Sequence, residues 1–146
     1  MYLEENWFQR AKKPQLAAGY TLRNYADEDY WQVSMLYIKS NIGFCDIDYF
    51  KPNLLPNGHK LIVDEINGRV VGSILAIESF ENCSVGRLEW LAVDERHRGK
   101  GLGAVLSYEI TSKLTSANYR RVELNTFEKM TSAIATYKKN GWRLDK

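Results

Sequence analysis

The feature that most constrains this chain is a six-residue run, Arg-Gly-Lys-Gly-Leu-Gly at 98–103, which stands between two apolar segments. The stretch 88–93 before it is typical of a strand, and the segment 104–114 after it has the pattern of an amphipathic helix. Glycine allows a tight turn that brings backbone N–H groups up to an anion, and the helix that follows directs its positive end to the same place. Arg96, Arg98 and Lys100 add positive charge. This order of elements predicts a site for a di- or triphosphate.

Two other phosphate-binding patterns fit the loop less well. Gly99-x-Gly101-x-x-Ala104 satisfies the dinucleotide fingerprint, and Glu123 lies at a suitable distance downstream for a ribose contact. That fingerprint belongs in a first βαβ unit, whereas here it follows a predicted hairpin, and residues 105–146 are too few for a second nucleotide-binding half. A Walker A string is absent from the sequence.

A family resemblance explains the loop better. Arg98-x-x-Gly101-x-Gly103 resembles R/Q-x-x-G-x-G/A, the pyrophosphate motif of the GCN5-related N-acetyltransferases (GNAT). The run 133–142, Ala-Ile-Ala-Thr-Tyr-Lys-Lys-Asn-Gly-Trp, resembles the second signature of that family, A-I-x-x-Y-x-K-x-G-F. The two matches occur in the family's order and separation, and the resemblance extends from about residue 20. We therefore expect an N-terminal extension at 1–19 and an acetyltransferase-like domain at 20–146.

Local patterns predict a mixed α/β fold (α+β). Strands are expected at 20–25, 61–63, 70–76, 88–93 and 122–124, and helices at 27–39, 102–114 and 134–139. Residues 40–58 have no regular pattern, and Asn67-Gly68 suits a type I′ hairpin turn. Trp31, Met35 and Ile38 share one face of the first helix. The expected architecture is a mixed, mostly antiparallel sheet with helices on both faces, which is also the acyl-CoA N-acyltransferase layout that the resemblance implies.

Composition limits the function classes. The 146 residues suit one domain, and a net charge of +2 is too small to indicate nucleic-acid binding. No apolar run is long enough to cross a membrane, and the first residues lack a signal-peptide pattern. Cys45 and Cys83 fit no zinc or redox spacing, and His59 and His97 are expected to be surface residues rather than metal ligands. We expect a reduced, cytoplasmic protein without a metal, a nucleic-acid partner or a membrane partner.

The resemblance implies where acetyl-CoA, the co-substrate, would lie. The pantetheine arm would pair with the backbone of Leu91, Ala92 and Val93. The family usually makes a further polar contact from a position occupied here by Met130, and we expect Asn125 and Thr126, at the end of the strand before it, to supply that contact instead. The residues implied to surround the pyrophosphate are Arg98, Gly99, Lys100, Gly101, Leu102, Gly103 and Ala104.

Two residues are candidates for proton transfer. Tyr137 matches the family tyrosine near the CoA sulfur, and a phenol with a pKa near 10 is protonated at neutral pH and can donate to a thiolate. Its alternative role is an ordinary buried aromatic. Glu89 is the candidate base. Burying a lone carboxylate on an otherwise apolar strand costs free energy, so its presence there suggests a functional role. A structural ion pair of Glu89 with Arg87 or Arg121 is the alternative.

Strand alternation adds a geometric expectation for the candidate base. It places Glu89, Leu91 and Val93 on one face of their strand and the intervening residues on the other. Tyr25, Tyr30, Phe44, Tyr49 and Phe50 fall in or near the region that lines the acceptor site in the family.

The end of the sequence departs from the family pattern. The chain stops soon after Trp142, whereas the family usually continues through one more strand. We expect the open sheet edge to be completed by a homodimer partner or by the N-terminal extension with Trp7 and Phe8, because Trp142 beside an open edge would be left near solvent.

The function that the resemblance implies is acetyl transfer from acetyl-CoA to a primary amine by direct attack, with Glu89 as base and Tyr137 as acid. The acceptor is expected to be a small-molecule or peptide amine. The alternatives are a CoA-binding regulatory module without turnover and a dinucleotide-binding module.

Overall fold

A single twisted sheet organises the chain in the computed structural model, which describes residues 2–3, 12–40, 46–125, 131–139 and 142–143. The described strands are β1 (Tyr2–Leu3), β2 (Tyr20–Asn24), β3 (Leu54–Asp64), β4 (Val70–Glu78), β5 (Val85–Val93), β6 (Arg121–Glu123) and β7 (Trp142–Arg143). The α-helices are α1 (Tyr30–Lys39), α2 (Leu102–Ser116) and α3 (Thr131–Lys139). Short 3₁₀ helices are η2 (Asp27–Asp29), η3 (Ile47–Asn53) and η4 (Glu95–His97).

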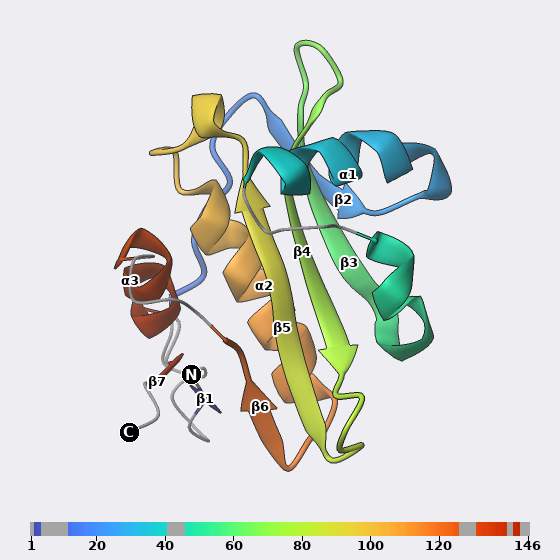
Figure 1. Ribbon diagram of the computed structural model, residues 1–146. Helices are drawn as coiled ribbons and strands as arrows, with labels where there is room; N and C mark the ends of the chain where they lie inside the picture. The colour runs from blue at the N-terminus through green and yellow to red at the C-terminus, as the bar shows by residue number, and fades with distance from the viewer. Residues whose placement is uncertain (1, 4–11, 41–45, 126–130, 140–141, 144–146) are drawn as a thin grey trace.

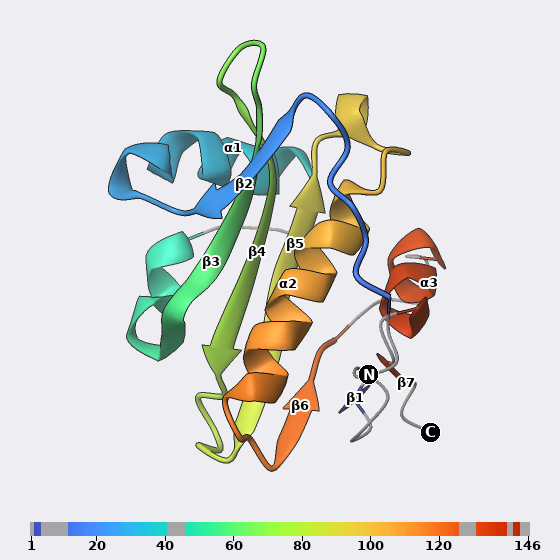
Figure 2. The ribbon, with the colours of Figure 1, turned by 180° about the vertical axis from the view of Figure 1, so that it is seen from behind.

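The strand order is β2-β3-β4-β5-β6-β1-β7. The pairings are antiparallel except that of β5 with β6, which is parallel. Helix α1 covers one face of the sheet and α2 the other, while α3 lies beyond the end of β6 (Figures 1 and 2). The mixed, mostly antiparallel sheet with helices on both faces is therefore confirmed.

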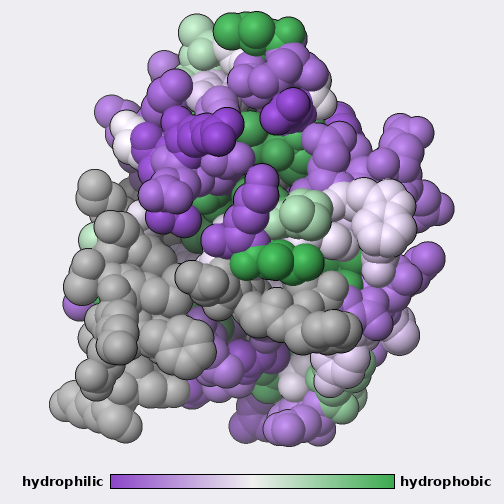
Figure 3. Space-filling view, turned by 45° about the horizontal axis from the view of Figure 1, so that its top comes forward, coloured by the Kyte–Doolittle hydropathy of each residue, from purple (hydrophilic) through white to green (hydrophobic). Residues whose placement is uncertain are grey.

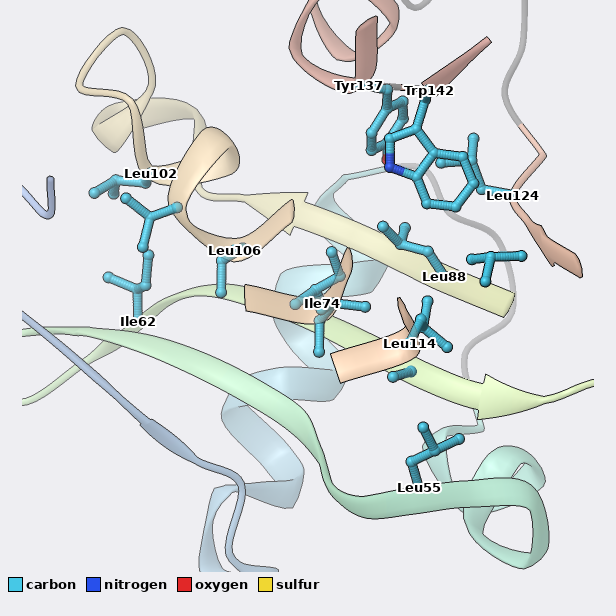
Figure 4. Packing of buried hydrophobic residues seen from close by; sticks show 14 of the residues in the cluster. Leu55, Ile62, Ile74, Leu88, Leu102, Leu106, Leu114, Leu124, Tyr137 and Trp142 are labelled. Carbon is cyan, nitrogen blue, oxygen red and sulfur yellow. The ribbon is translucent and has the colours of Figure 1, made fainter. Parts of the chain in front are cut away.

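The larger core lies between the sheet and helices α2 and α3 (Figure 4). Leu102, Leu106, Ile110 and Leu114 repeat every four residues along α2, and all four are buried, as their spacing predicts. Each such side chain stabilises the fold by about 1.5–3 kcal/mol relative to exposure. This core fixes α2 along the sheet and thereby places its N-terminus beside the end of β5.

Helix α1 does not pack on the sheet with the face that holds Trp31, Met35 and Ile38. Trp31 is 76% exposed, and Met35 and Ile38 are also exposed, whereas Val33 and Tyr37 are buried. Both sets have helical spacing, so periodicity alone could not choose between them. The aromatic side chain at position 31 lies on the solvent side.

The β3–β4 hairpin was predicted correctly, but its turn type was not. The Asp64 N–H donates to the Arg69 carbonyl, which leaves four residues in the loop, and Gly68 has a positive φ of 70° whereas Asn67 does not. A type I′ turn needs positive φ at both central residues. Strand β3 also begins at Leu54, within the stretch 40–58 that was expected to be irregular.

A β-bulge interrupts β5 and overturns the expected alternation. Ser73 pairs with Ala92 and Leu75 pairs with Glu89, so β5 has one more residue than β4 between these pairs. Trp90, inside the bulge, has a positive φ of 52°. Glu89 therefore shares the face of Leu75, while Leu91 packs on the opposite face against the α2 core.

The sheet edge beyond β6 is formed by the two ends of the chain. Strand β1 pairs with β6 on one side and with β7 on the other. Trp142 is only 1% exposed and its Nε1 donates to Thr111 Oγ1 at 3.0 Å, so it is not left near solvent at this edge. Trp7 and Phe8 lie outside the described residues.

Candidate active site

The candidate site begins where β5 and β6 separate. Their pairing ends at Arg87 and Glu123, and β5 then continues to Val93 (Figure 1). On this side, the described strands form no ladder with β5 beyond Arg87. Leu91, Ala92 and Val93 lie in this stretch, here called the gap, where the backbone groups of β5 on the β6 side have no ladder partner among the described strands.

The glycine loop closes one end of the gap. Gly99 and Gly101 have φ angles of 80° and 78°, a region that other residues rarely adopt, and Gly101 is the N-cap of α2. The first backbone bond of the helix runs from the Val105 N–H to the Gly101 carbonyl at 3.2 Å. The N–H groups of residues 102–104 therefore have no partner within the helix and converge where the positive end of the helix dipole lies. These features fit a pyrophosphate.

Contacts to neighbouring elements hold the basic side chains of this loop. Arg98 Nε donates to the Val93 carbonyl at 3.2 Å, and Lys100 Nζ donates to the Tyr20 hydroxyl oxygen at 3.2 Å. The same hydroxyl is hydrogen-bonded to His97 Nδ1 at 2.7 Å. Tyr20 thus ties the loop to β2, a link of long sequence separation that the sequence did not suggest.

A groove of about 540 Å³ lies near this loop on the α1 side. Figure 3 shows an apolar floor there, surrounded by hydrophilic side chains. Its lining includes the apolar Val70 and Val71 and the basic Arg69 and Arg96. No residue of β5, β6 or α3 contributes to the described lining, so the groove is separate from the gap.

Tyr137 lies at the side of the gap. It is 5% exposed and contacts Trp142 edge-on, with ring centroids 6.4 Å apart (Figure 4). Burial raises the pKa of Tyr137 well above its usual value, and the nearby charge of Glu89 raises that pKa further. The phenol is therefore protonated at neutral pH, and it lies close enough to Glu89 for the two groups to interact.

Glu89 is part of a chain of ion pairs across β5 and β6. Arg87 Nε donates to Glu89 Oε1 at 2.9 Å, and both side chains are partly buried. Arg87 also reaches Glu123 at 3.5 Å, and Glu123 in turn contacts Arg121 at 2.7 Å. The pair of Glu89 with Arg87, the alternative weighed from the sequence, is thus formed.

The other residues that the sequence suggested for the pantetheine contact and the acceptor site lie in different parts of the structure. Asn125 is exposed just beyond β6, while Thr126, Met130 and Phe44 lie outside the described residues. Tyr25 and Phe50 line a cavity beside η3, but Tyr30 and Tyr49 do not belong to its described lining.

His59 was expected at the surface, and that prediction is wrong. It is 5% exposed, its Nε2 is hydrogen-bonded to Ser73 Oγ at 2.8 Å, and Ser73 Oγ is bonded to the Tyr37 hydroxyl at 2.8 Å. Burial lowers the pKa of His59 to about 4, so this imidazole is neutral at pH 7. Its position in β3 was hidden because Pro56 and Gly58 obscured the strand pattern.

Two kinds of feature are absent from the part of the chain that the structure describes. No group of three or more His, Cys, Asp or Glu side chains is arranged to hold a metal ion in that part of the chain. None of the helices among those residues is long and apolar enough to cross a bilayer.

Comparison with known proteins agrees with this geometry. Residues 20–142 match the acetyltransferase (GNAT) family. An uncharacterized N-acetyltransferase of Methanocaldococcus jannaschii is 28% identical over 140 residues, which cover 87% of this chain but only 62% of that protein. The chain thus spans less than two thirds of this relative.

Two solved structures share the fold. Ard1 from Thermoplasma volcanium superposes with a TM-score of 0.74 at 24% identity, covering 88% of this chain and 86% of that one. Arabidopsis thaliana Naa50, in complex with the bisubstrate analogue CoA-Ac-MVNAL, gives a TM-score of 0.71 at 21% identity, with the same coverages of 88% and 86%.

Proposed function

The chain belongs to the acetyltransferase (GNAT) family, and from this membership we propose that it transfers the acetyl group of acetyl-CoA to a primary amine by direct attack. One observation carries the proposal. The β5 edge runs unpaired with β6 beyond Arg87, with the glycine loop at its end and Glu89 and Tyr137 beside it. A thioester held along that edge would lie between a phosphate site and two groups able to move protons.

The residues that would hold acetyl-CoA fall into two sets. The backbone of Leu91, Ala92 and Val93 would pair with the amides of the pantetheine arm, as another strand would. The N-terminus of α2 would bind the pyrophosphate, and Arg98 and Lys100 would add positive charge. Asn125, just beyond β6, would contact the pantetheine arm. The residues assigned to the phosphates are Arg98, Gly99, Lys100, Gly101, Leu102, Gly103 and Ala104.

The proposed reaction needs no enzyme-bound acetyl group. The amine nitrogen attacks the thioester carbon, a C–N bond forms, and the C–S bond breaks. Glu89 accepts the proton that the amine loses, directly or through water, and Tyr137 donates a proton to the departing sulfur. The raised pKa of Tyr137 keeps that proton in place until a thiolate develops. The contact with Arg87 holds the Glu89 carboxylate in one position on β5.

The test compares turnover with CoA affinity. Tyr137→Phe and Glu89→Gln should each lower kcat by about 10²–10⁴-fold while the Kd for CoA changes little. Tyr119→Phe is the matched control, because it also removes a phenol hydroxyl, one that donates to Glu78. Wild-type turnover in both active-site variants, measured with a confirmed acceptor, would show that the site works by positioning alone.

A CoA-binding regulatory module is the second candidate. The 2.9 Å contact between Arg87 and Glu89 favours it, because that contact gives the carboxylate a structural role and occupies one of its oxygens. This module would be stabilised by CoA, by about 2.7 kcal/mol at a hundred times the Kd, without acetylating any amine. Thermal unfolding also distinguishes both candidates from a dinucleotide site. CoA should raise the Tm under either candidate, whereas NAD should raise it only if the loop binds a dinucleotide.

The acceptor class and the assembly state are part of the same proposal. The bisubstrate analogue bound to Naa50 joins CoA to a short peptide sequence, which makes a peptide amine one possible acceptor class; a small-molecule amine is the other. A homodimer remains compatible with the sheet, and light scattering on the intact chain tests it.

A further inference from the structure

A row of four residues crosses the sheet from the gap to β2. Glu89 pairs with Leu75, and Leu75 pairs with His59. The Tyr25 N–H donates to the His59 carbonyl at 2.9 Å, and the two rings stack with centroids 4.4 Å apart. Residues directly opposite one another share a face, so all four point to the α1 side. With strands about 4.8 Å apart, the row spans about 14 Å.

A cavity of about 110 Å³ covers the far part of this row. Its lining consists of Tyr25, Asp27, Ile47, Asp48, Phe50, Lys51, Leu54, His59 and Leu75. Phe50 joins this cavity to the bulge, because its ring meets that of Trp90 edge-on at 4.6 Å. Leu75 lines the cavity and pairs with Glu89, so the cavity lies one strand away from the candidate base.

The middle of the cavity is apolar and uncharged. Ile47, Phe50, Leu54 and Leu75 supply aliphatic and aromatic surface, and His59 is neutral at pH 7 because burial lowers its pKa to about 4. An unbranched hydrocarbon chain can lie here without burying a polar group. A peptide backbone would bring N–H and C=O groups into the same space, and each would be costly without a partner.

The far end of the cavity is acidic. Asp27 and Asp48 are exposed at its rim, with Lys51 as a single opposing charge. Burial, followed by the charges of Asp27 and Asp48, raises the pKa of Tyr25 to about 12. The field at this end is therefore negative and suits a cation.

We infer that the cavity binds the distal half of the acceptor, and that the acceptor is a linear aliphatic diamine or polyamine. The inference rests on the proposed function. One terminal amine, deprotonated at Glu89, forms the new C–N bond as the C–S bond of acetyl-CoA breaks. The alkyl chain passes over Leu75 and Phe50, and a second, protonated amine lies between Asp27 and Asp48.

The test uses acceptors that differ only in the second charge. We compare kcat/KM for diaminohexane with that for hexylamine, and for diaminopentane with that for pentylamine. The wild-type chain should prefer each diamine by about tenfold, because two rim carboxylates contact the distal ammonium. Asp27→Asn combined with Asp48→Asn should bring that ratio close to one.

Glu28→Gln is the matched control, since it neutralises an exposed carboxylate beside Asp27 that does not line the cavity. It should keep the tenfold ratio. Equal kcat/KM for diamine and monoamine, or a peptide amine preferred over every diamine, would overturn the inference and leave the proposed function standing. Failure to acetylate any amine despite CoA binding would overturn both.

Discussion

Replacing Gly101 with alanine allows two effects to be measured separately: the loss of unfolding free energy from the left-handed backbone at this position, and the loss of CoA affinity. Gly101 has a φ of 78°, and a Cβ placed on it would meet no atom within 4 Å. The change therefore adds no steric clash in the unliganded protein. Its cost is the left-handed backbone, about 1–2 kcal/mol of unfolding free energy for a residue with a Cβ. For a chain of this size, that loss corresponds to a fall in Tm of roughly 3–8 °C.

The same substitution should weaken CoA binding, because the added methyl lies beside the N–H groups at the start of α2. Displacing even one charge-assisted hydrogen bond costs about 1.5–3 kcal/mol, so we expect the Kd to rise at least tenfold. Gly68→Ala is the matched control. Its φ is 70°, a Cβ there also meets nothing within 4 Å, and it lies in the β3–β4 loop.

Thermal unfolding and calorimetric titration with CoA provide both readouts. Gly101→Ala and Gly68→Ala should lose similar stability, but only the former should lose CoA affinity. An unchanged Kd for Gly101→Ala, or equal losses of affinity in both variants, would refute the assignment of the loop to the phosphates.

Three further predictions concern single side chains. Arg98→Ala should weaken CoA much more than a pantetheine fragment without phosphates, as calorimetry would show; equal losses would exclude a phosphate contact. Tyr20→Phe removes the hydroxyl that contacts Lys100 and His97, and should raise the KM for acetyl-CoA about three- to tenfold with kcat nearly unchanged. The folded-state pKa of His59, about 4, is below its ordinary 6.5, so the unfolded chain binds the extra proton and stability should fall as the pH is lowered from about 6.5 to 4. Denaturant unfolding should show a smaller slope over that window in His59→Gln, and an equal slope would contradict the assignment.

Local sequence signals were sufficient for most of the fold. The every-fourth-residue repeat of α2 predicted its buried face, because a helix that packs on a sheet must present one apolar stripe. The turn residues at 67–68 located the β3–β4 hairpin, although the loop proved to have four residues. Side-chain bonds to the backbone explain that difference: Asp64 Oδ1 accepts from Ile66 N–H, and Asn67 Oδ1 accepts from Arg69 N–H.

Features that depend on distant parts of the chain were not predictable in this way. The insertion of β1 between β6 and β7 joins the two ends of the sequence, and two-residue strands carry no periodic pattern. The bulge at Trp90 inverted the predicted faces of β5, because one extra residue shifts every later side chain. The bulge also moved Glu89 to the face of the η3 cavity, which no spacing rule had indicated.

The part of the candidate site that one continuous segment forms could be predicted from the sequence. Arg98 and Gly101 form one loop whose composition points to an anion, and the structure places that loop at the N-terminus of α2. Tyr137 and Glu89 come from elements far apart in the sequence, so their proximity could be expected only from a resemblance. His59, Ser73 and Tyr37 were missed because they come from three different elements, and only their contact is informative.

Mass spectrometry of a primary-amine panel incubated with the protein and acetyl-CoA tests the central claim most directly. We predict that one or more amines gain a single acetyl group, that one free CoA thiol appears for each, and that the protein itself carries no acetyl group during turnover. Release of CoA thiol with acetyl bound covalently to the protein would contradict direct attack. Tight CoA binding with no amine modified would contradict the enzyme and favour the regulatory module.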